Sequence, residues 1–314
     1  MSPGSPTTFG LLASVPVCTP LRQGRPQQQV QAPPRLQPRV HKKLPVILQD
    51  GRPVCESLSS WSTSTRRSRP APRATSPMTP TTRMAGKEDM KLLGMLVSPF
   101  AIRVRMALSM KGVSYEYAEE DLLNKSDLLL SSNPVHKMVP VLIHNGKPLC
   151  ESLVIVQYVD ELFAGPSILP TDPYKRATAR FWAAFVDDKL CPAWIGILKE
   201  TKTEDERAEK VKVAHAAIMQ IEEAFPKLSE GKAFFGGDSI GYLDIVLGSC
   251  LFWFEAFRRM FDVEIIKSSE APLLAAWAER FGETAEAKEV VPEADEAVQY
   301  AHKLRAAYAA AVTK

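Results

Sequence analysis

Two places in the sequence combine a polar side chain with the expected start of a helix. Ser98 precedes Pro99 at the end of a short apolar run, and Glu151 and Ser152 follow a hairpin signal. Serine is a preferred N-cap, proline suits the first helical turn, and an acidic residue is common there. A helix N-terminus also favours nearby negative charge, so the helix start at Ser98 could stabilise an anion as well as cap a helix.

The cysteines form neither a disulfide framework nor a zinc motif. They are an odd number without a C-x-x-C pair, namely Cys18, Cys55, Cys150, Cys191 and Cys250. That usage suits a reducing compartment and favours no metal site.

The elements that position these residues begin near residue 84. The patterns predict a strand, a helix, a second strand, a helix-like segment, a hairpin around Asn145-Gly146 and a final helix. The strands and clear helices are expected at Lys91–Val97, Pro99–Gly112, Ser114–Tyr117, Val139–Ile143, Pro148–Cys150 and Glu151–Phe163. This order predicts a four-stranded mixed sheet with helices on its faces.

A second, helical domain is expected after a linker rich in proline, residues 164–173. Long amphipathic stretches follow, with apolar stripes at Phe181, Trp182, Phe185 and Leu190, and at Val211, Ile218, Ile221 and Phe225. We expect the two domains to span residues 84–165 and 172–314.

Several segments, in matching order and spacing, resemble the plant tau-class glutathione transferases. They are KLLGMLVSPFAIRVRMALSMKG, NKSDLLLSSNPVHK, VPVLIHNGKPLCES and FGGDSIGYLDI, and the resemblance runs from Met84 to near Lys314. It implies an α/β thioredoxin-like N-terminal domain followed by an all-α domain. It further implies a homodimer, or a heterodimer with related subunits, that uses glutathione as co-substrate and needs no cofactor.

The resemblance implies a serine-type mechanism. Ser98 would stabilise the glutathione thiolate, the reactive nucleophile, for attack on hydrophobic electrophiles or for reduction of organic peroxides. Such an enzyme would serve detoxification of foreign compounds and the stress response.

The resemblance also implies where glutathione binds. Glu151 and Ser152 would hold its γ-glutamyl end, and the backbone of Val139 would pair with its cysteinyl unit. Pro140 would be a cis-proline that turns that backbone toward the ligand. Asp187 would support the γ-glutamyl end across the dimer interface.

One residue of this predicted site departs from the family pattern. Lys125 matches a lysine that reaches the glycyl carboxylate, but Met138 stands where a second lysine usually joins it. Losing a desolvated charge-assisted contact costs roughly 1.5–3 kcal/mol, so we predict weakened glutathione binding.

The second, hydrophobic substrate is expected between the two domains, a common place for ligand pockets. The residues that the resemblance implies are Phe100, Cys191, Ile195, Trp253, Tyr300 and Leu304. Alternatively, each is ordinary core. In FGGDSIGYLDI, Gly241 and Asp244 predict an N-cap and its partner in the first turn, a role in folding.

Two alternative functions use the same cleft. One is a non-catalytic carrier of apolar small molecules, which Met138 favours. The other is a glutathione-dependent thiol transferase or dehydroascorbate reductase, but that chemistry requires cysteine where this chain has Ser98.

Charge separates the chain into two parts. Residues 1–85 hold 12 of the 39 basic residues and only two acidic ones, so the rest of the chain is acidic and its composition argues against nucleic-acid binding. Residues 1–83 are also rich in proline, and we expect a disordered basic extension there.

The extension contains a partial copy of the predicted glutathione site. Residues 40–58 read VHKKLPVILQDGRPVCESL, and residues 135–153 read VHKMVPVLIHNGKPLCESL; the copy keeps lysine, Lys43, where the second reads Met138. Our hypothesis is a damaged tandem copy or a mis-joined gene model, with translation beginning at Met84. The alternative is a plastid transit peptide. No apolar run is long enough to span a membrane and no secretory signal is evident, so we expect a cytoplasmic protein.

Overall fold

The structure is a computed structural model that describes residues 46–49, 52–55, 89–199 and 203–312. The predicted extension lies outside these residues, apart from two short strands. β1 (Val46–Gln49) and β2 (Arg52–Cys55) pair antiparallel, with Val46 opposite Cys55. The sequence analysis did not predict these strands, although it identified the segment as a copy of residues 135–153, in which it predicted a hairpin.

A four-stranded mixed sheet forms the first part of the body, as predicted. It contains β3 (Met90–Gly94), β4 (Glu116–Glu119), β5 (Val141–His144) and β6 (Lys147–Cys150) in the order β4-β3-β5-β6. β3 runs parallel to β4 and antiparallel to β5, and β5 pairs antiparallel with β6. The thioredoxin-like arrangement is therefore confirmed.

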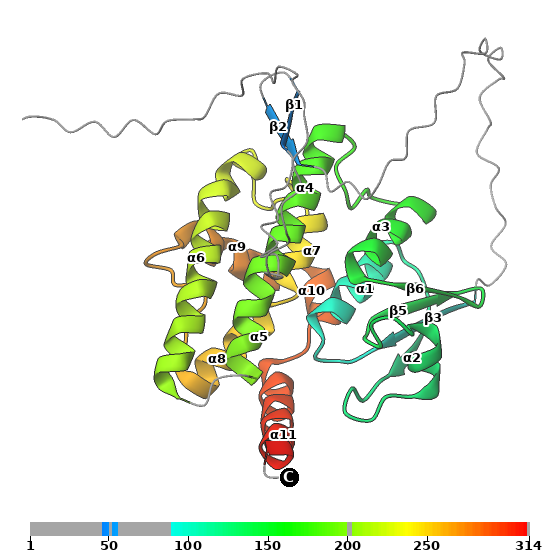
Figure 1. Ribbon diagram of the computed structural model, residues 1–314. Helices are drawn as coiled ribbons and strands as arrows, with labels where there is room; N and C mark the ends of the chain where they lie inside the picture. Colours follow the sequence, from blue (N-terminus) through cyan, green and yellow to red (C-terminus); the bar gives the residue numbers. More distant parts are fainter. Residues whose placement is uncertain (1–45, 50–51, 56–88, 200–202, 313–314) are drawn as a thin grey trace, which may run out of the picture. The chain divides into compact units, whose positions relative to one another are not determined.

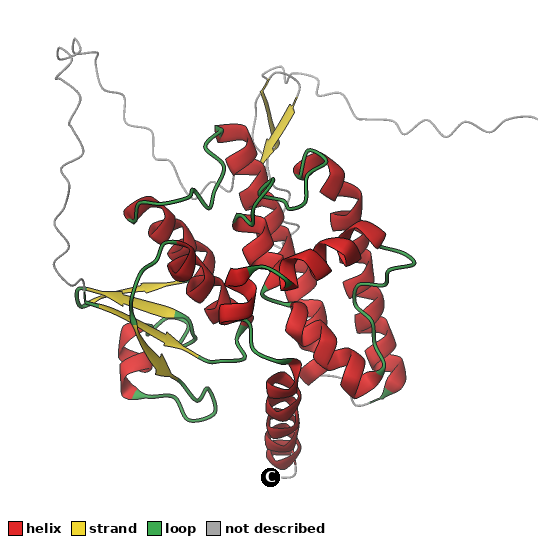
Figure 2. Cartoon of the chain, turned by 180° about the vertical axis from the view of Figure 1, so that it is seen from behind, coloured by secondary structure: helices red, strands yellow, loops and turns green. Residues whose placement is uncertain are grey.

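Three helices cover this sheet: α1 (Pro99–Met110), α2 (Asp127–Ser132) and α3 (Ser152–Leu162). In Figures 1 and 2, α1 and α3 lie together on one face and α2 lies on the other. α1 starts at Pro99, directly after its N-cap Ser98, as predicted, and the chain leaves the helix at Gly112, whose φ of 63° suits glycine. Asn145 and Gly146 also have positive φ, as a two-residue hairpin turn requires.

The described chain from Pro173 onward is helical (Figure 2), as expected. Its elements are α4 (Pro173–Phe185), a π-helical turn (Val186–Leu190), α5 (Cys191–Lys199), α6 (Glu204–Leu228), α7 (Tyr242–Gly248), α8 (Leu251–Phe261), α9 (Pro272–Gly282), α10 (Ala285–Val290) and α11 (Ala294–Val312). The π-helical turn joins α4 to α5 without a break, and it carries Asp187.

Asp244 organises the start of α7, in the folding role predicted for it. Its carboxylate accepts N–H groups from Gly241, Gly236, Phe235 and Trp277 at 2.7–3.0 Å. Burial raises the pKa of Asp244 to about 6, although these four donors favour the carboxylate. Glycine at 241 has a packing reason, because a Cβ there would lie 2.9 Å from the Cα of Gly236.

Candidate active site

Ser98 lies in the loop between β3 and α1, almost fully buried. Its hydroxyl oxygen accepts the backbone N–H of Ala101 at 3.3 Å and so caps α1. Its own N–H donates to the carbonyl of Met95 at 2.9 Å, which closes the loop into a turn. A hydroxyl that accepts one hydrogen bond keeps its hydrogen for donation. Capping and donation to an anion are therefore compatible at Ser98.

The loop before β5 carries Val139 and Pro140. Their peptide bond is cis, as the resemblance implied, and both residues are buried. Buried Asn133 holds the loop, since its side-chain amide donates to the carbonyl of Met138 at 2.9 Å and its oxygen accepts the N–H of His136 at 3.1 Å. The sequence analysis missed Asn133, because an asparagine beside a proline signals only a turn.

Glu151 and Ser152 stand at the start of α3. Glu151 has a φ of 73°, which is unusual for a residue with a side chain, and its carboxylate is exposed within 3.6 Å of the imidazole Nε2 of His136. Ser152 is buried and accepts the Nη1–H of Arg103 at 3.3 Å. One polar side chain here thus faces solvent and the other faces the core.

Lys125 and Met138 are neighbours. The ammonium nitrogen of Lys125 lies 3.9 Å from the sulfur of Met138, whose side chain is largely exposed at 44%. The structure therefore places methionine next to the lysine that the family pattern pairs with a second lysine.

Arg103 is the most connected residue of the site, and the sequence analysis missed it. It is fully buried and makes a bidentate ion pair with Asp187, with nitrogen–oxygen distances of 2.7 and 3.0 Å. Besides Ser152, it reaches the hydroxyl of Ser249 at 3.3 Å and the carbonyl of Val246 at 3.4 Å. α1 and α3 are thereby joined to α7 and to the π-helical turn.

The charge of Arg103 is secured by its partners. Burial alone would lower the pKa of its guanidinium, but the ion pair with Asp187 outweighs burial and the pKa is raised. A signal for this residue exists in the sequence. Arg103 lies four residues after Pro99 and four before Ala107, both buried, so it shares the buried face of α1.

Exposure separates the six residues expected to contact the hydrophobic substrate. Phe100, Ile195 and Tyr300 are partly exposed, whereas Cys191, Trp253 and Leu304 are no more than 5% exposed. Cys191 lies 3.9 Å from Nη2 of Arg103, and the indole N–H of Trp253 donates to the carbonyl of Val97 at 2.9 Å. Both of these residues therefore belong to the packed interior in this structure.

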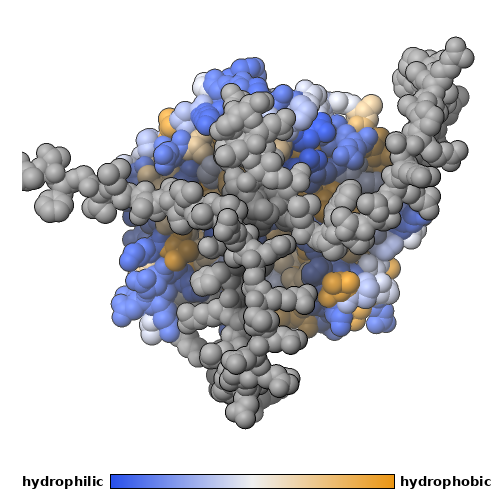
Figure 3. Space-filling model, turned by 45° about the horizontal axis from the view of Figure 1, so that its top comes forward, coloured by the Kyte–Doolittle hydropathy of each residue, from blue (hydrophilic) through white to orange (hydrophobic). Residues whose placement is uncertain are grey.

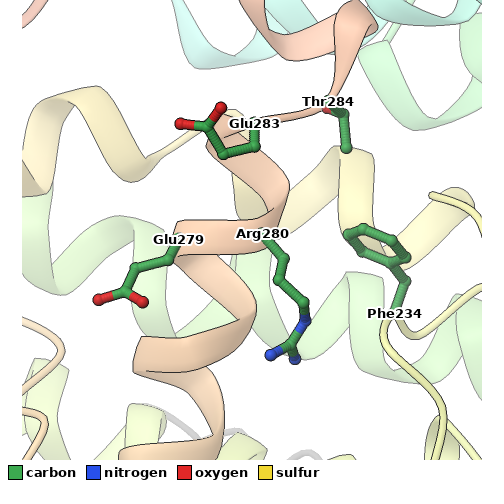
Figure 4. A pocket seen from close by; sticks show the side chains of 5 residues that line it. All are labelled: Phe234, Glu279, Arg280, Glu283 and Thr284. Carbon is green, nitrogen blue, oxygen red and sulfur yellow. The ribbon is translucent and has the colours of Figure 1, made fainter.

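A surface cavity of about 410 Å³ lies away from all of these residues. Figure 4 shows its lining, which is Phe234, Glu279, Arg280, Glu283 and Thr284. None of them belongs to the predicted site.

Among the described residues no cluster of His, Cys, Asp and Glu could hold a metal ion, and no helix is long and apolar enough to cross a membrane.

Comparisons with known proteins give consistent findings. Residues 88–161 match the model of the glutathione S-transferase N-terminal domain, and residues 204–280 match that of the C-terminal domain. A probable glutathione S-transferase, GSTU6 of Oryza sativa subsp. japonica, is 54% identical over 70% of this chain and 96% of its own length. Glutathione S-transferase U16 of Arabidopsis thaliana is 46% identical, over 70% of this chain and 95% of its own length.

Solved structures agree with these relatives. The tau-class glutathione S-transferase of mango (Mangifera indica) is 48% identical with a TM-score of 0.65, covering 69% of this chain and 98% of its own. A rice transferase solved in complex with glutathione is 38% identical with a TM-score of 0.64, covering 71% of this chain and 99% of its own.

Proposed function

Since the chain belongs to the tau class of plant glutathione S-transferases, we propose that it is a serine-type enzyme in which Ser98 stabilises the thiolate of glutathione. The thiol of glutathione loses its proton to solvent, and the hydroxyl of Ser98 donates a hydrogen bond to the resulting sulfur anion. That sulfur then forms a bond to an electrophilic carbon of an apolar substrate, from which a leaving group departs with the bonding electron pair.

The position of Ser98 is the observation that carries this proposal. Its hydroxyl lies at the N-terminus of a twelve-residue helix, α1, and is shielded from water. The positive end of the helix and a charge-assisted hydrogen bond both favour an anion at this place. Together they would lower the pKa of a thiol that binds there.

The rest of glutathione has matching groups around Ser98. We assign the γ-glutamyl ammonium to Glu151 and its carboxylate to Ser152 at the N-terminus of α3. Val139, turned by the cis peptide bond at Pro140, offers its backbone to the cysteinyl unit. Lys125 reaches the glycyl carboxylate, with Met138 beside it.

Arg103 and Asp187 support this arrangement from the buried interior, behind Ser152. Arg103 donates to the hydroxyl of Ser152 and pairs with both carboxylate oxygens of Asp187, so it fixes Ser152 rather than contacting glutathione. The role of Asp187 in glutathione binding therefore acts through Arg103.

The electrophile would contact the partly exposed residues of the predicted set, namely Phe100, Ile195 and Tyr300.

The same thiolate can reduce an organic hydroperoxide: two glutathione molecules give one disulfide, while the hydroperoxide becomes an alcohol and water. Exposed Met138 leaves one cation for the glycyl carboxylate, and this favours a second candidate function, a carrier of apolar ligands with weak glutathione binding.

The partner is a second subunit of the same class, paired through α3 and α4. Val154 and Phe181 are 53% and 47% exposed there, and Arg180 of α4 donates to Gln157 of α3 at 2.8 Å. Because an aromatic side chain left half exposed is a common interface anchor, we expect Phe181→Glu to yield monomers. Light scattering after size exclusion measures this, and a dimer that persists unchanged would contradict the assignment.

Conjugation of glutathione to chlorodinitrobenzene tests the enzymatic proposal. We expect Ser98→Ala to lower kcat/KM by about tenfold to a hundredfold, the cost of one hydrogen bond to a charged group. Thr284→Ala is the matched control, because Thr284 caps α10 through a hydrogen bond of the same length, 3.3 Å, and is not among the residues assigned to the site. Equal rates for wild type and Ser98→Ala would contradict the proposed serine mechanism.

A further inference from the structure

The loop that carries Ser98 is held by hydrogen bonds from two sides. Residues 95–98 join β3 to α1, and their backbone groups at Leu96 and Val97 lie outside the sheet ladder. The N–H of Leu96 donates to both carboxylate oxygens of Glu119, at 3.0 and 3.1 Å. The carbonyl of Val97 accepts the indole N–H of Trp253 at 2.9 Å. The peptide groups that join Met95 to Leu96 and Val97 to Ser98 are therefore each fixed by a side chain distant in sequence.

Glu119 acts from the sheet. It is the last residue of β4, the parallel neighbour of β3, and the hydroxyl of Tyr117 donates to its Oε2 at 2.8 Å. Burial, together with this hydrogen bond, raises the pKa of Tyr117 above its ordinary value, so the phenol remains a donor. The Glu119 carboxylate is thus oriented before it meets Leu96.

Trp253 acts from the helical domain. It lies in α8 and is 2% exposed, stacked on Trp194 with ring centroids 5.7 Å apart and tilted against Phe257 at 5.9 Å. A buried indole has one polar group, and an unpaired one would cost free energy. Its single donor meets the residue directly before Ser98, so this bond links the helical domain to the loop.

We propose that Trp253 and Glu119 are positioning residues for Ser98, and that Trp253 fixes the serine hydroxyl relative to the helical domain that holds the electrophile. The proposal rests on the function proposed for Ser98. A displacement of about 1 Å can cost up to a hundredfold in rate, and two anchored peptide planes leave the loop little freedom to move. Trp253 thus serves the reaction without contacting either substrate, whereas the resemblance implied a place in the substrate pocket, with the packed core as the alternative.

The experiment compares Trp253→Phe with Trp194→Phe. Both substitutions keep an aromatic ring in the same stacked cluster, but the indole N–H of Trp194 has no hydrogen-bond partner among the described residues. For Trp253→Phe we expect kcat to fall about tenfold, KM for glutathione to stay within about twofold, and the pKa of the bound thiol to rise. Trp194→Phe should show none of these changes. Equal effects from the two variants would reduce Trp253 to a packing residue and overturn the proposal.

Glu119 provides a second pair of variants in case Trp253→Phe does not fold. Its side chain is exposed, so neither variant threatens the core. Glu119→Gln retains an acceptor for the N–H of Leu96, and Glu119→Ala removes it. We expect Glu119→Ala to raise the pKa of the bound thiol. In Glu119→Gln this pKa should stay close to its wild-type value. No difference between the two would contradict a positioning role for Glu119.

Double variants separate the failure of this proposal from the failure of the one on which it rests. With Ser98→Ala already present, Trp253→Phe should have no further effect on the pKa of the bound thiol. If Ser98→Ala alone leaves that pKa unchanged, the role of Ser98 is wrong. If Ser98→Ala raises it while Trp253→Phe and Glu119→Ala do not, only the positioning role is wrong.

Discussion

Met138 is a residue at which this chain departs from the family pattern. Its sulfur lies 3.9 Å from the ammonium of Lys125, where a second cation would be expected. We predict that Met138→Lys lowers KM for glutathione by about fivefold, less than a desolvated contact would give, because the side chain is 44% exposed and solvent screens the charge. Steady-state kinetics measures this.

Met138→Leu is the control for that substitution, since it changes the side chain without adding charge. KM should remain near the wild-type value in this variant. If Met138→Lys leaves KM unchanged or raises it, the methionine does not explain weak binding.

The positions of individual site residues were predictable where a local sequence motif indicates them. Ser98 and Ser152 stand at helix starts, as the sequence indicates, because a helix start is set by neighbouring residues; of the two, only Ser98 caps its helix. Arg103 was not predicted. Its partners Asp187 and Ser249 come from distant parts of the chain, and only the folded core shows that a buried cation is paired there.

At the scale of elements, α1, α3 and the hairpin were predicted within a few residues of their bounds. β4 was expected at Ser114–Tyr117 and forms at Glu116–Glu119. The shift has a physical cause, since its pairing with β3 places Glu116 opposite Lys91, with which it forms an ion pair at 3.1 Å. A strand end set by its neighbour cannot be located from its own residues.

A buried ion pair ties two elements together and predicts acid sensitivity. Lys111, just after α1, lies 2.9 Å from Asp160 of α3, which also accepts the N–H groups of Ile168 and Leu169. Burial opposes ionisation of Asp160, but these hydrogen bonds and Lys111 outweigh it and lower its pKa. The folded state therefore binds this proton less readily than the unfolded state does.

The sign of the pH dependence follows from that difference. Asp160 contributes stability above the unfolded carboxyl pKa of 3.8, and the contribution is lost as pH falls through the lower folded value. We predict that Asp160→Asn costs about 3 kcal/mol near pH 7, because the buried ammonium of Lys111 keeps only its hydrogen bond to the carbonyl of Pro166 and loses its counterion. Urea unfolding at several pH values measures this; the variant should lose less stability than wild type in acid, and parallel losses would contradict the assignment.

At the scale of the whole chain, the duplicated segment is the feature that the family does not explain. β1 and β2 pair Val46 with Cys55, and β5 and β6 pair the corresponding Val141 with Cys150, so copy and counterpart share one register. The curated relatives match about 70% of this chain with nearly their full length. The family models match residues 88–161 and 204–280, outside the copy, so we expect the catalytic unit to need no residues from it.

We therefore predict that residues 84–314 retain the kcat/KM of the full chain within about twofold, since every residue assigned to the site lies in this range. The conjugation assay on both proteins measures this. A loss of several-fold on truncation would show that the extension contributes to the site.

Figure 3 shows mostly hydrophilic residues on the uncovered part of one face, with small and separate hydrophobic patches. The sequence analysis did not predict that Arg103 and Trp253 join the two domains, because this depends on contacts between residues far apart in sequence.

Titration of the bound thiol tests the serine mechanism most directly. The ultraviolet absorbance of the thiolate, followed against pH in the complex with glutathione, reports the pKa of the sulfur at Ser98 itself. We predict that this pKa lies well below that of free glutathione in the wild type and rises by about one to two units in Ser98→Ala. The same low pKa in both proteins would contradict the account.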